Sequence, residues 1–164
     1  QEVLTALQTG RLDAAEFVSP YNDLAAGYHT VADYYYYPGW HEPGSTLETI
    51  FNKEKLDALP SDLREILMAG TEVMNQLLLD LFMAENNKAL RTLVEDHGVQ
   101  LRRLPDDVLI ELRRISDEVV AELGQTDEIT ARVYESWKSF KDGAMNYNRI
   151  AEEALIEARK LPSN

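Results

Sequence analysis

The sequence predicts an α/β protein with short strands early in the chain and long helices in its second half. Two observations support this prediction. Residues 1–52 are rich in aromatic residues, Gly and Pro and divide into short segments, whereas apolar residues recur at helical spacing from about residue 53 onward. Residues 99–104 alternate in polarity and form the one strand-like interruption of the helical part. Mixed short elements followed by helices are typical of this fold class.

The first segments differ in type along the chain. Residues 2–9 predict a short helix that ends at Gly10, since glycine readily adopts the left-handed conformation that closes a helix. Residues 12–18 predict a short buried strand. Ser19 and Pro20 then predict the start of another short helix, because proline suits the first helical position.

Two further strands are expected before the helical part begins. Residues 34–37 are four consecutive tyrosines, which favour a strand, and Pro38 with Gly39 would end it. Residues 46–52 carry aliphatic and aromatic side chains and predict one more short strand.

Three helices are expected in the rest of the chain. A long helix should begin at residues 59–63 and extend to about residue 97, where Gly98 follows as a stop. Its apolar stripe is expected to be ordinary core. A second helix is expected over residues 105–123, and a final helix over residues 127–160.

Composition excludes several functions. The chain has 164 residues and a mass of 18.6 kDa, enough for one domain with its own core. Sixteen Lys and Arg against 29 Asp and Glu give a formal charge of −13, which argues against binding to nucleic acid or to anionic membranes. The lack of cysteine excludes disulfides, thiolate nucleophiles, Fe–S clusters and cysteine zinc sites. No signal peptide is recognisable, and the apolar runs are expected to be too short to span a bilayer.

Motifs of common enzyme classes are missing. Neither G-x-x-x-x-G-K-[ST] nor G-x-G-x-x-G nor G-x-S-x-G occurs. The three histidines are not part of an H-E-x-x-H motif, so a zinc hydrolase has little support. His97 is expected to lie at a helix end, where a cation suits the helix dipole, and His29 is expected on the surface or in a loop. The acidic residues of the last helix lack Glu-x-x-His elements and are expected to form a solvated face.

Two stretches suggest more than a structural role. Glu16 lies within an otherwise apolar segment, and a buried carboxylate costs several kcal/mol unless it is paired or bound to a cation. The second stretch, residues 34–44, holds Trp40, His41 and Glu42 between two Pro-Gly pairs. Binding groups concentrate on positioned loops, so this stretch is either a presented site or a structural aromatic corner.

These two stretches also carry a family resemblance. Residues 13–25 (DAAEFVSPYNDLA) and 34–44 (YYYYPGWHEPG) closely resemble the solute-binding component of TRAP transporters, the DctP-type family. Within it they are similar to the branch that binds 2-oxo acids and related monocarboxylates. The resemblance continues through residues 51–53, 97–99 and 105–106 and covers essentially the whole chain.

The resemblance implies a periplasmic receptor whose two α/β lobes close over a small organic acid and deliver it to the permease subunits in the membrane. Part of the carboxylate would be held by a bound Na⁺ or Ca²⁺. By position, Glu16 and Glu42 correspond to cation-ligating carboxylates, and Phe17, usually Trp in relatives, would offer its main-chain carbonyl. Phe17, Trp40 and His41 would line the substrate pocket. Hard cations take such oxygen ligands, and two buried acids could not both stay charged without one.

The resemblance also predicts the organisation of the chain. Residues 1–52 would be the strand-rich part of the ligand-binding lobe and the interlobe crossover, and residues 53–125 a helical packing region with one strand. Residues 126–164 would form a long C-terminal helix through which two copies form a homodimer. The signal peptide, the first lobe and the arginine that clamps the substrate would lie upstream of Gln1. The chain is therefore expected to be the C-terminal part of a two-lobed periplasmic-binding-protein-like fold, completed by a missing N-terminal part.

Two other functions remain open. The chain could be a helical dimerisation module without a ligand, in which case the aromatic loop is structural. A metal-dependent hydrolase using Glu16 and Glu42 would need a third ligand, a nucleophile and a base, so enzyme activity is not expected. The sequence leaves open which organic acid and which cation would bind.

Overall fold

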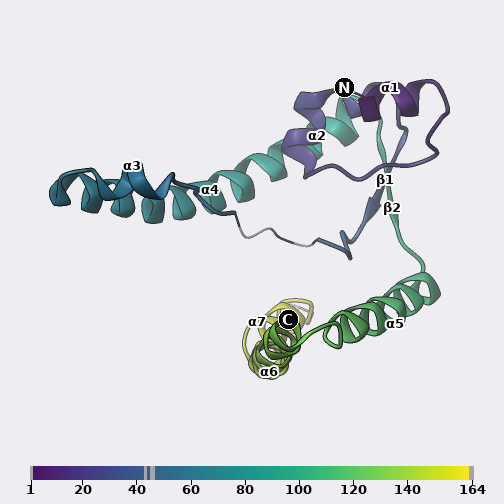
Figure 1. Ribbon diagram of the computed structural model, residues 1–164. Helices are drawn as coiled ribbons and strands as arrows, with labels where there is room; N and C mark the ends of the chain where they lie inside the picture. Colours follow the sequence, from purple (N-terminus) through teal and green to yellow (C-terminus); the bar gives the residue numbers. More distant parts are fainter. Residues whose placement is uncertain (1, 43, 45–46, 163–164) are drawn as a thin grey trace. The chain divides into compact units, whose positions relative to one another are not determined.

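The computed structural model of the chain describes residues 2–42, 44 and 47–162 (Figure 1). It divides into two compact units, Gln1–Leu104 and Pro105–Asn164, which are described one at a time. The first contains α1 (Glu2–Gln8), α2 (Pro20–Ala26), the 3-10 helix η1 (Tyr28–Thr30), β1 (Tyr34–Tyr37), α3 (Lys53–Asp57), α4 (Ser61–Glu95) and β2 (Gln100–Arg103). The second contains α5 (Asp106–Leu123), α6 (Glu128–Ile150) and α7 (Glu152–Ala158). The described chain is thus mostly helical with two short strands.

The first two helices begin and end where the sequence predicts. Gly10 follows α1 with φ 69°, and Gly27 closes α2 with φ 82°, both in the left-handed region. Pro20 occupies the first turn of α2, where its missing N–H has no helical partner to lose.

The strand expected at residues 12–18 is wrong. The chain between α1 and α2 has no regular structure, and the side chains of Leu12 and Val18 are 43% and 57% exposed. The two strands of the sheet in the described residues are β1 and β2, and neither pairs with this segment. Glu16 is therefore not buried, and its side chain is 49% exposed.

The two strands that do form are the tyrosine run and the alternating segment. β1 and β2 pair in parallel, with Tyr34 opposite Gln100 and Tyr37 opposite Arg103. Because parallel strands need a long crossover connection, α3 and α4 lie in the chain between them.

The strand expected at 46–52 is wrong over its described part, residues 47–52, and position 46 lies outside the described residues. Leu47 and Ile50 are 70% and 83% exposed, so the segment has no apolar layer to join. Asn52 instead caps α3, since its side-chain oxygen accepts a hydrogen bond from the Lys55 N–H at 3.0 Å.

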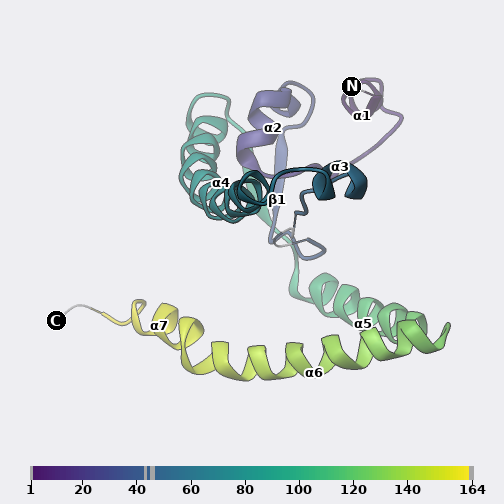
Figure 2. The same ribbon diagram turned by 60° about the vertical axis from the view of Figure 1, so that its left-hand side comes forward.

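The core of the first unit lies where α2 meets the C-terminal part of α4. Tyr21 meets Phe82 edge-on at a centroid distance of 6.2 Å, and its N–H donates to Asn86 Oδ1 at 2.9 Å. The buried apolar side chains of the described chain are Ala89, Leu93 and Val99. This contact anchors α2 and the segment that precedes it (Figure 2).

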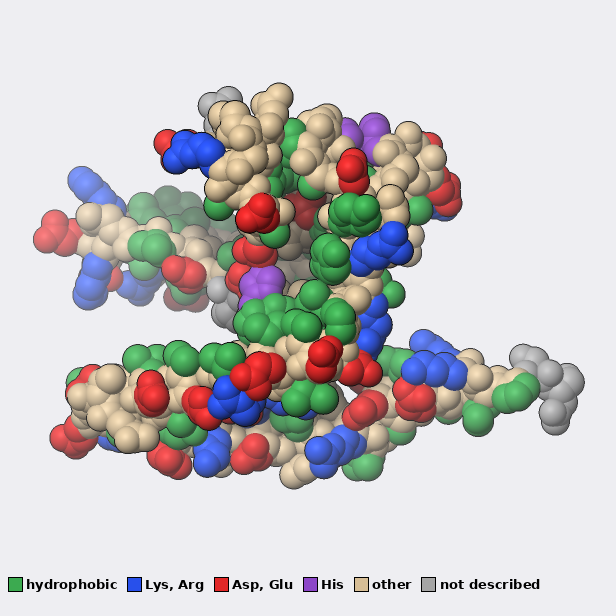
Figure 3. All heavy atoms as spheres, turned by 90° about the vertical axis from the view of Figure 1, so that its right-hand side faces the viewer, with side chains coloured by type: hydrophobic (Ala, Val, Ile, Leu, Met, Phe, Trp, Pro, Cys, Tyr) green, Lys and Arg blue, Asp and Glu red, His purple; other side chains and the backbone are tan. Residues whose placement is uncertain are grey.

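The rest of α4 is exposed, contrary to the expectation of an ordinary core helix. It contains an 18-residue stretch with a mean hydropathy of 1.3 and at most two charged residues, none of it buried. By length and composition alone this helix could cross a membrane, which corrects the expectation that the apolar runs are too short. One such helix is weak evidence for a membrane span, since the core helix of a larger soluble protein passes the same test. Hydrophobic side chains are visible at the surface in Figure 3.

The second unit is built around α5 and α6. Asp127 caps α6 by accepting a hydrogen bond from the Thr130 N–H at 2.9 Å. Gly124 ends α5 against the ring of Tyr134, where a Cβ would lie 2.7 Å from a ring carbon. The turn therefore requires glycine for space rather than for its backbone angles.

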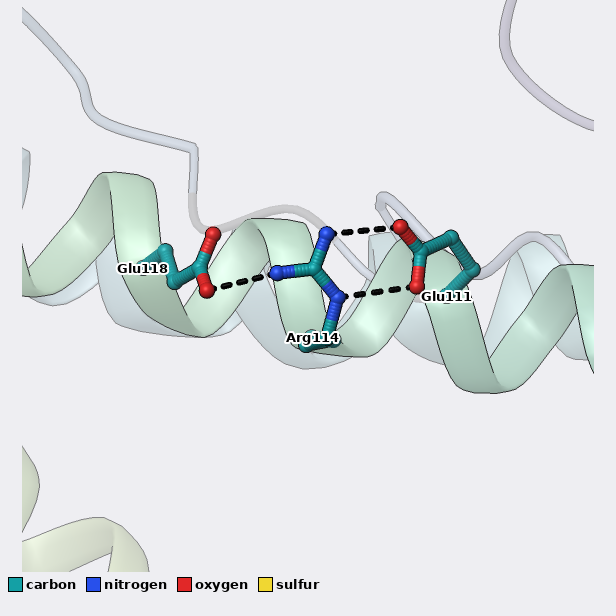
Figure 4. A network of polar contacts seen from close by, with 3 residues as sticks. All are labelled: Glu111, Arg114 and Glu118. Atoms are coloured by element: carbon teal, nitrogen blue, oxygen red, sulfur yellow. Dashed lines mark hydrogen bonds and ion pairs between the residues drawn. The ribbon is translucent and has the colours of Figure 1, made fainter.

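The single helix expected over residues 127–160 is divided in two. Ala151, with φ −102° and ψ −99°, leaves the helical region and separates α6 from α7. Alanine is a strong helix former, so local preference does not predict this break. The carboxylates of this unit form solvated surface as expected of its helices. In α5, Arg114 bridges Glu111 and Glu118 on the exposed face (Figure 4).

Candidate functional site

The candidate site residues lie on two segments of the first unit. Glu16 and Phe17 belong to the loop that leads into α2, and Trp40, His41 and Glu42 follow β1. Both segments are therefore held by a regular element at one end. Pro43, which the sequence interpretation placed in the second segment, lies outside the described residues.

The structure brings the two segments into contact at Glu16 and His41. Glu16 Oε1 lies 3.7 Å from His41 Nε2, and the two side chains are 49% and 38% exposed. His41 also meets Trp40 edge-on at a centroid distance of 5.4 Å. Glu42 directly follows His41 in the chain, and the two segments meet at the contact between Glu16 and His41.

Phe17 has a partner in the first unit. Its ring lies 5.1 Å from the ring of Tyr28 in a tilted arrangement, while the residue remains 47% exposed. Tyr28 begins η1, directly after the end of α2. The aromatic contact therefore fixes the loop beside the helix that it precedes.

Asp23 is the buried charged residue beneath this loop. It is 9% exposed, and its Oδ2 accepts a hydrogen bond from the Tyr35 hydroxyl at 2.5 Å. Its Oδ1 accepts a longer one from the Val18 N–H at 3.4 Å. Burial raises the pKa of Asp23, the hydrogen bond from Tyr35 opposes this, and the negative charge of Glu16 adds to the rise.

Tyr35 responds to the same surroundings. Burial raises the pKa of its hydroxyl first, followed by the hydrogen bond to Asp23 and the charges of Asp23 and Glu16. The hydroxyl therefore stays protonated and acts as a donor. Sequence reasoning missed this pair because no spacing links residues 23 and 35. The one available signal was an acid within the short helix predicted after Ser19 and Pro20.

A small cavity of about 30 Å³ lies beside Asp23, a space of the size that one water molecule needs. His29 lines it and stacks on His97, which follows the last turn of α4. His29 is half-buried in η1 rather than a free surface residue, and His97 contacts a ring in another segment. This pairing of two histidines was also absent from the sequence interpretation.

A larger groove of about 290 Å³ lies in the second unit, between α5 and α6. It is lined by Asp117, Val120, Tyr134, Trp137, Lys138, Lys141 and Asp142. Lys141 lies 4.8 Å from the centroid of Trp137 and 3.6 Å from Asp117, so its charge already has partners. The groove is the interface along which α5 and α6 pack.

The donor set of the candidate cation site suits a hard cation but is incomplete. Ca²⁺ takes about six to eight oxygen ligands, whereas Glu16, Glu42 and the carbonyl of Phe17 offer only a few. No three His, Asp or Glu side chains in residues 2–42, 44 and 47–162 lie close enough together to hold a metal ion. The remaining ligands would have to come from a bound acid, from water or from protein outside this chain.

Comparison with known proteins gives a consistent family. A family model described as bacterial extracellular solute-binding protein, family 7, matches residues 1–127. A monocarboxylate 2-oxoacid-binding periplasmic protein from Nostoc sp. is 35% identical over 151 residues, which are 92% of this chain and 41% of that protein.

Solved structures agree. A TRAP transporter solute-binding protein from Bordetella bronchiseptica matches 96% of the chain with a TM-score of 0.89 and 30% identity, and is described as a mixed-occupancy dimer with copurified calcium and picolinate. Periplasmic TRAP proteins from Pseudoalteromonas atlantica, with bound sodium and pyruvate, and Colwellia psychrerythraea, with bound calcium and pyruvate, match with TM-scores of 0.87 and 0.89. They are 33% and 31% identical over 95% and 96% of this chain.

The chain spans less than half the length of these relatives. It covers 47%, 47% and 48% of the three solved chains. The mostly helical arrangement with two parallel strands therefore corresponds to part of a larger fold.

Proposed function

The chain belongs to the bacterial extracellular solute-binding proteins, family 7, and from this premise we propose that it supplies the cation-binding part of a periplasmic receptor for a small 2-oxo acid. Proteins of this family bind solutes and are not enzymes. The hydrolase alternative therefore falls away, and the periplasm is the compartment of the relatives.

The observation that carries the proposal is the contact between Glu16 and His41. At 3.7 Å it joins the loop before α2 to the segment that contains Glu42. A cation placed there would meet carboxylate and carbonyl oxygens, which suit Na⁺ and Ca²⁺. Related proteins hold sodium or calcium together with an organic acid, which supports the same role for Glu16, Glu42 and the Phe17 carbonyl.

The ligands of the relatives share one chemical property. Pyruvate and picolinate each place a second donor atom next to the carboxylate, a ketone oxygen in one and a ring nitrogen in the other. Such a ligand can chelate a cation through both atoms. We therefore propose a small monocarboxylate with a donor atom at the adjacent position as the solute, with Phe17, Trp40 and His41 along the pocket wall.

The remainder of the receptor would complete the pocket. The chain spans under half of its relatives, and the cation lacks most of its expected ligands here. We propose that the missing part of the receptor closes over the acid and that the receptor delivers it to TRAP permease subunits. In this proposal the missing part of the receptor packs on the exposed apolar surface of α4.

The second unit supports a homodimer. Apolar residues recur along one face of α6, and all are exposed: Ile129, Val133, Phe140, Tyr147 and Ile150. This face points away from the residues that line the groove toward α5. A related structure is a dimer, and we propose that two copies of this chain pair through the α6 face.

Calorimetry on the full-length receptor tests the cation site. Chelator-treated protein is titrated with CaCl₂ or NaCl and then with pyruvate. Glu16→Gln and Glu42→Gln are each expected to weaken cation binding by more than about tenfold, since each removes a charged ligand. Glu48→Gln, an exposed acid in the next loop, is the matched control and should bind like the wild type. Absence of cation and acid binding in the wild type would instead favour the ligand-free dimerisation module.

A further inference from the structure

Asp23 forms hydrogen bonds to the loop that carries Glu16 and Phe17 and to β1, the strand that precedes Trp40, His41 and Glu42. It lies in α2, which packs against α4, and is 9% exposed. One carboxylate oxygen accepts a hydrogen bond from the Tyr35 hydroxyl in β1, at 2.5 Å, and the other accepts one from the Val18 N–H in the loop, at 3.4 Å. A single side chain thus links the loop with Glu16 and Phe17 to the strand that leads into the segment with His41 and Glu42.

The two hydrogen bonds of Asp23 constrain the segments that carry the proposed cation ligands. Val18 directly follows Phe17, so its hydrogen bond constrains where the Phe17 carbonyl and Glu16 lie. Tyr35 lies in the strand whose following segment carries His41 and Glu42. Loops without regular structure keep a precise geometry only when such bonds hold them.

We propose that Asp23 and Tyr35 are positioning residues for the cation site, holding the Glu16–Phe17 loop against β1 so that its oxygens meet Glu42. This inference rests on the proposed function. Neither residue contacts the cation in this arrangement, and both act through the segments that do.

Burial explains why this linkage is strong enough to matter. A buried carboxylate must be hydrogen-bonded, so Asp23 cannot turn to solvent without losing its partners. Tyr35 is half-buried and pairs with it from the neighbouring element. The loop residues Glu16 and Phe17 are by contrast about half exposed, and their side chains contact His41 and Tyr28.

Tyr35→Phe in the full-length receptor tests the assignment. Its matched control is Tyr36→Phe, the next residue of β1, which is 57% exposed and points to the opposite face of the strand. The Kd for Ca²⁺ is measured by calorimetry after chelator treatment. Tyr35→Phe should raise this Kd by up to about fivefold, the upper limit set by one lost hydrogen bond that acts through the loop, and Tyr36→Phe should leave it unchanged.

A second measurement separates positioning from general support of the fold. The Kd for pyruvate is determined at saturating Ca²⁺ and below the melting temperature. Positioning of the cation ligands changes the Ca²⁺ Kd, whereas this pyruvate Kd stays close to that of the wild type. Should Tyr35→Phe not fold, Asp23→Asn makes the same comparison, since it keeps the shape and one acceptor oxygen.

The outcomes are distinct. A wild-type receptor that binds Ca²⁺ and pyruvate, with Tyr35→Phe showing the same Ca²⁺ Kd, overturns the positioning role alone. A wild-type receptor that binds neither overturns the proposed function and this inference with it. A lower melting temperature in chelator with an unchanged Ca²⁺ Kd shows that the pair only stabilises the fold.

Discussion

His29 and His97 stack on one another with ring centroids 4.0 Å apart and an angle of 31° between the ring planes. The first lies in η1 and the second follows α4, so the pair joins two segments of the first unit that are distant in sequence. The Nδ1 atom of His29 is buried without a hydrogen-bond partner in the described chain. Burial lowers the pKa of His29, and the positive charge of a protonated His97 lowers it further.

This lowered pKa predicts a loss of stability in mild acid. The unfolded chain binds a proton at His29 near pH 6.5, before the folded chain does. The free energy of unfolding is therefore expected to be fully present above about pH 6.5 and to fall as the pH drops toward the folded pKa. His29→Gln should reduce this fall, measured as melting temperatures between pH 5 and pH 8.

The control for the pH experiment is Tyr36→Phe, which changes an exposed residue outside the stacked pair and should keep the wild-type slope between pH 5 and pH 8. Asp23 lines the same cavity as His29, and burial raises its pKa, so its contribution to the free energy of unfolding has the opposite sign and is lost as the pH rises. Equal slopes for wild type and His29→Gln would contradict the prediction.

Gly124 is expected to tolerate no side chain. A Cβ there would lie 2.7 Å from the Tyr134 ring, so Gly124→Ala must displace either the ring or the end of α5. We expect a destabilisation of about 1–3 kcal/mol by overpacking, measured by chemical denaturation. Gly70→Ala in α4 is the control, since no atom lies within 4 Å of its Cβ position. Alanine should stabilise that helix by about 0.5–1 kcal/mol.

Phe140 is expected to stabilise the homodimer proposed above. It is 78% exposed in the middle of the apolar face of α6, so a charge there would be buried between two copies. Phe140→Asp should shift the receptor from dimer to monomer, measured by light scattering after size-exclusion chromatography. Arg149→Ser, on the opposite side of α6, should leave the mass unchanged. A Phe140→Asp protein that remains dimeric would place the interface elsewhere.

Several elements could be predicted because their signals are local. The tyrosine run forms β1, and the long apolar repeat forms α4. Residues 12–18 show why the same reasoning fails elsewhere: a strand needs a neighbouring strand, and sequence preference does not supply one. The break at Ala151 has no local signal, since the residues around it favour a helix.

For the candidate site, too, the sequence identified the residues but not their contacts. Glu16, Phe17 and the segment with Trp40, His41 and Glu42 could be chosen from the sequence because their motifs are distinctive. Their approach to each other could not, since it depends on where α2 and β1 lie. The expectation that Glu16 is buried is wrong, because its loop lies at the surface of the described chain.

The sequence by itself determined the family, the helices with strong periodicity and the residue types that suit an oxygen-ligated cation, because these depend on neighbouring positions along the chain. Only the tertiary structure decided that Asp23 bonds to both Tyr35 and Val18, and that His29 stacks on His97. The sequence separation of these residues follows neither helical nor strand periodicity, so no sequence pattern predicts the contacts. They form when α2, α4 and β1 pack together and bury polar groups that must then find partners.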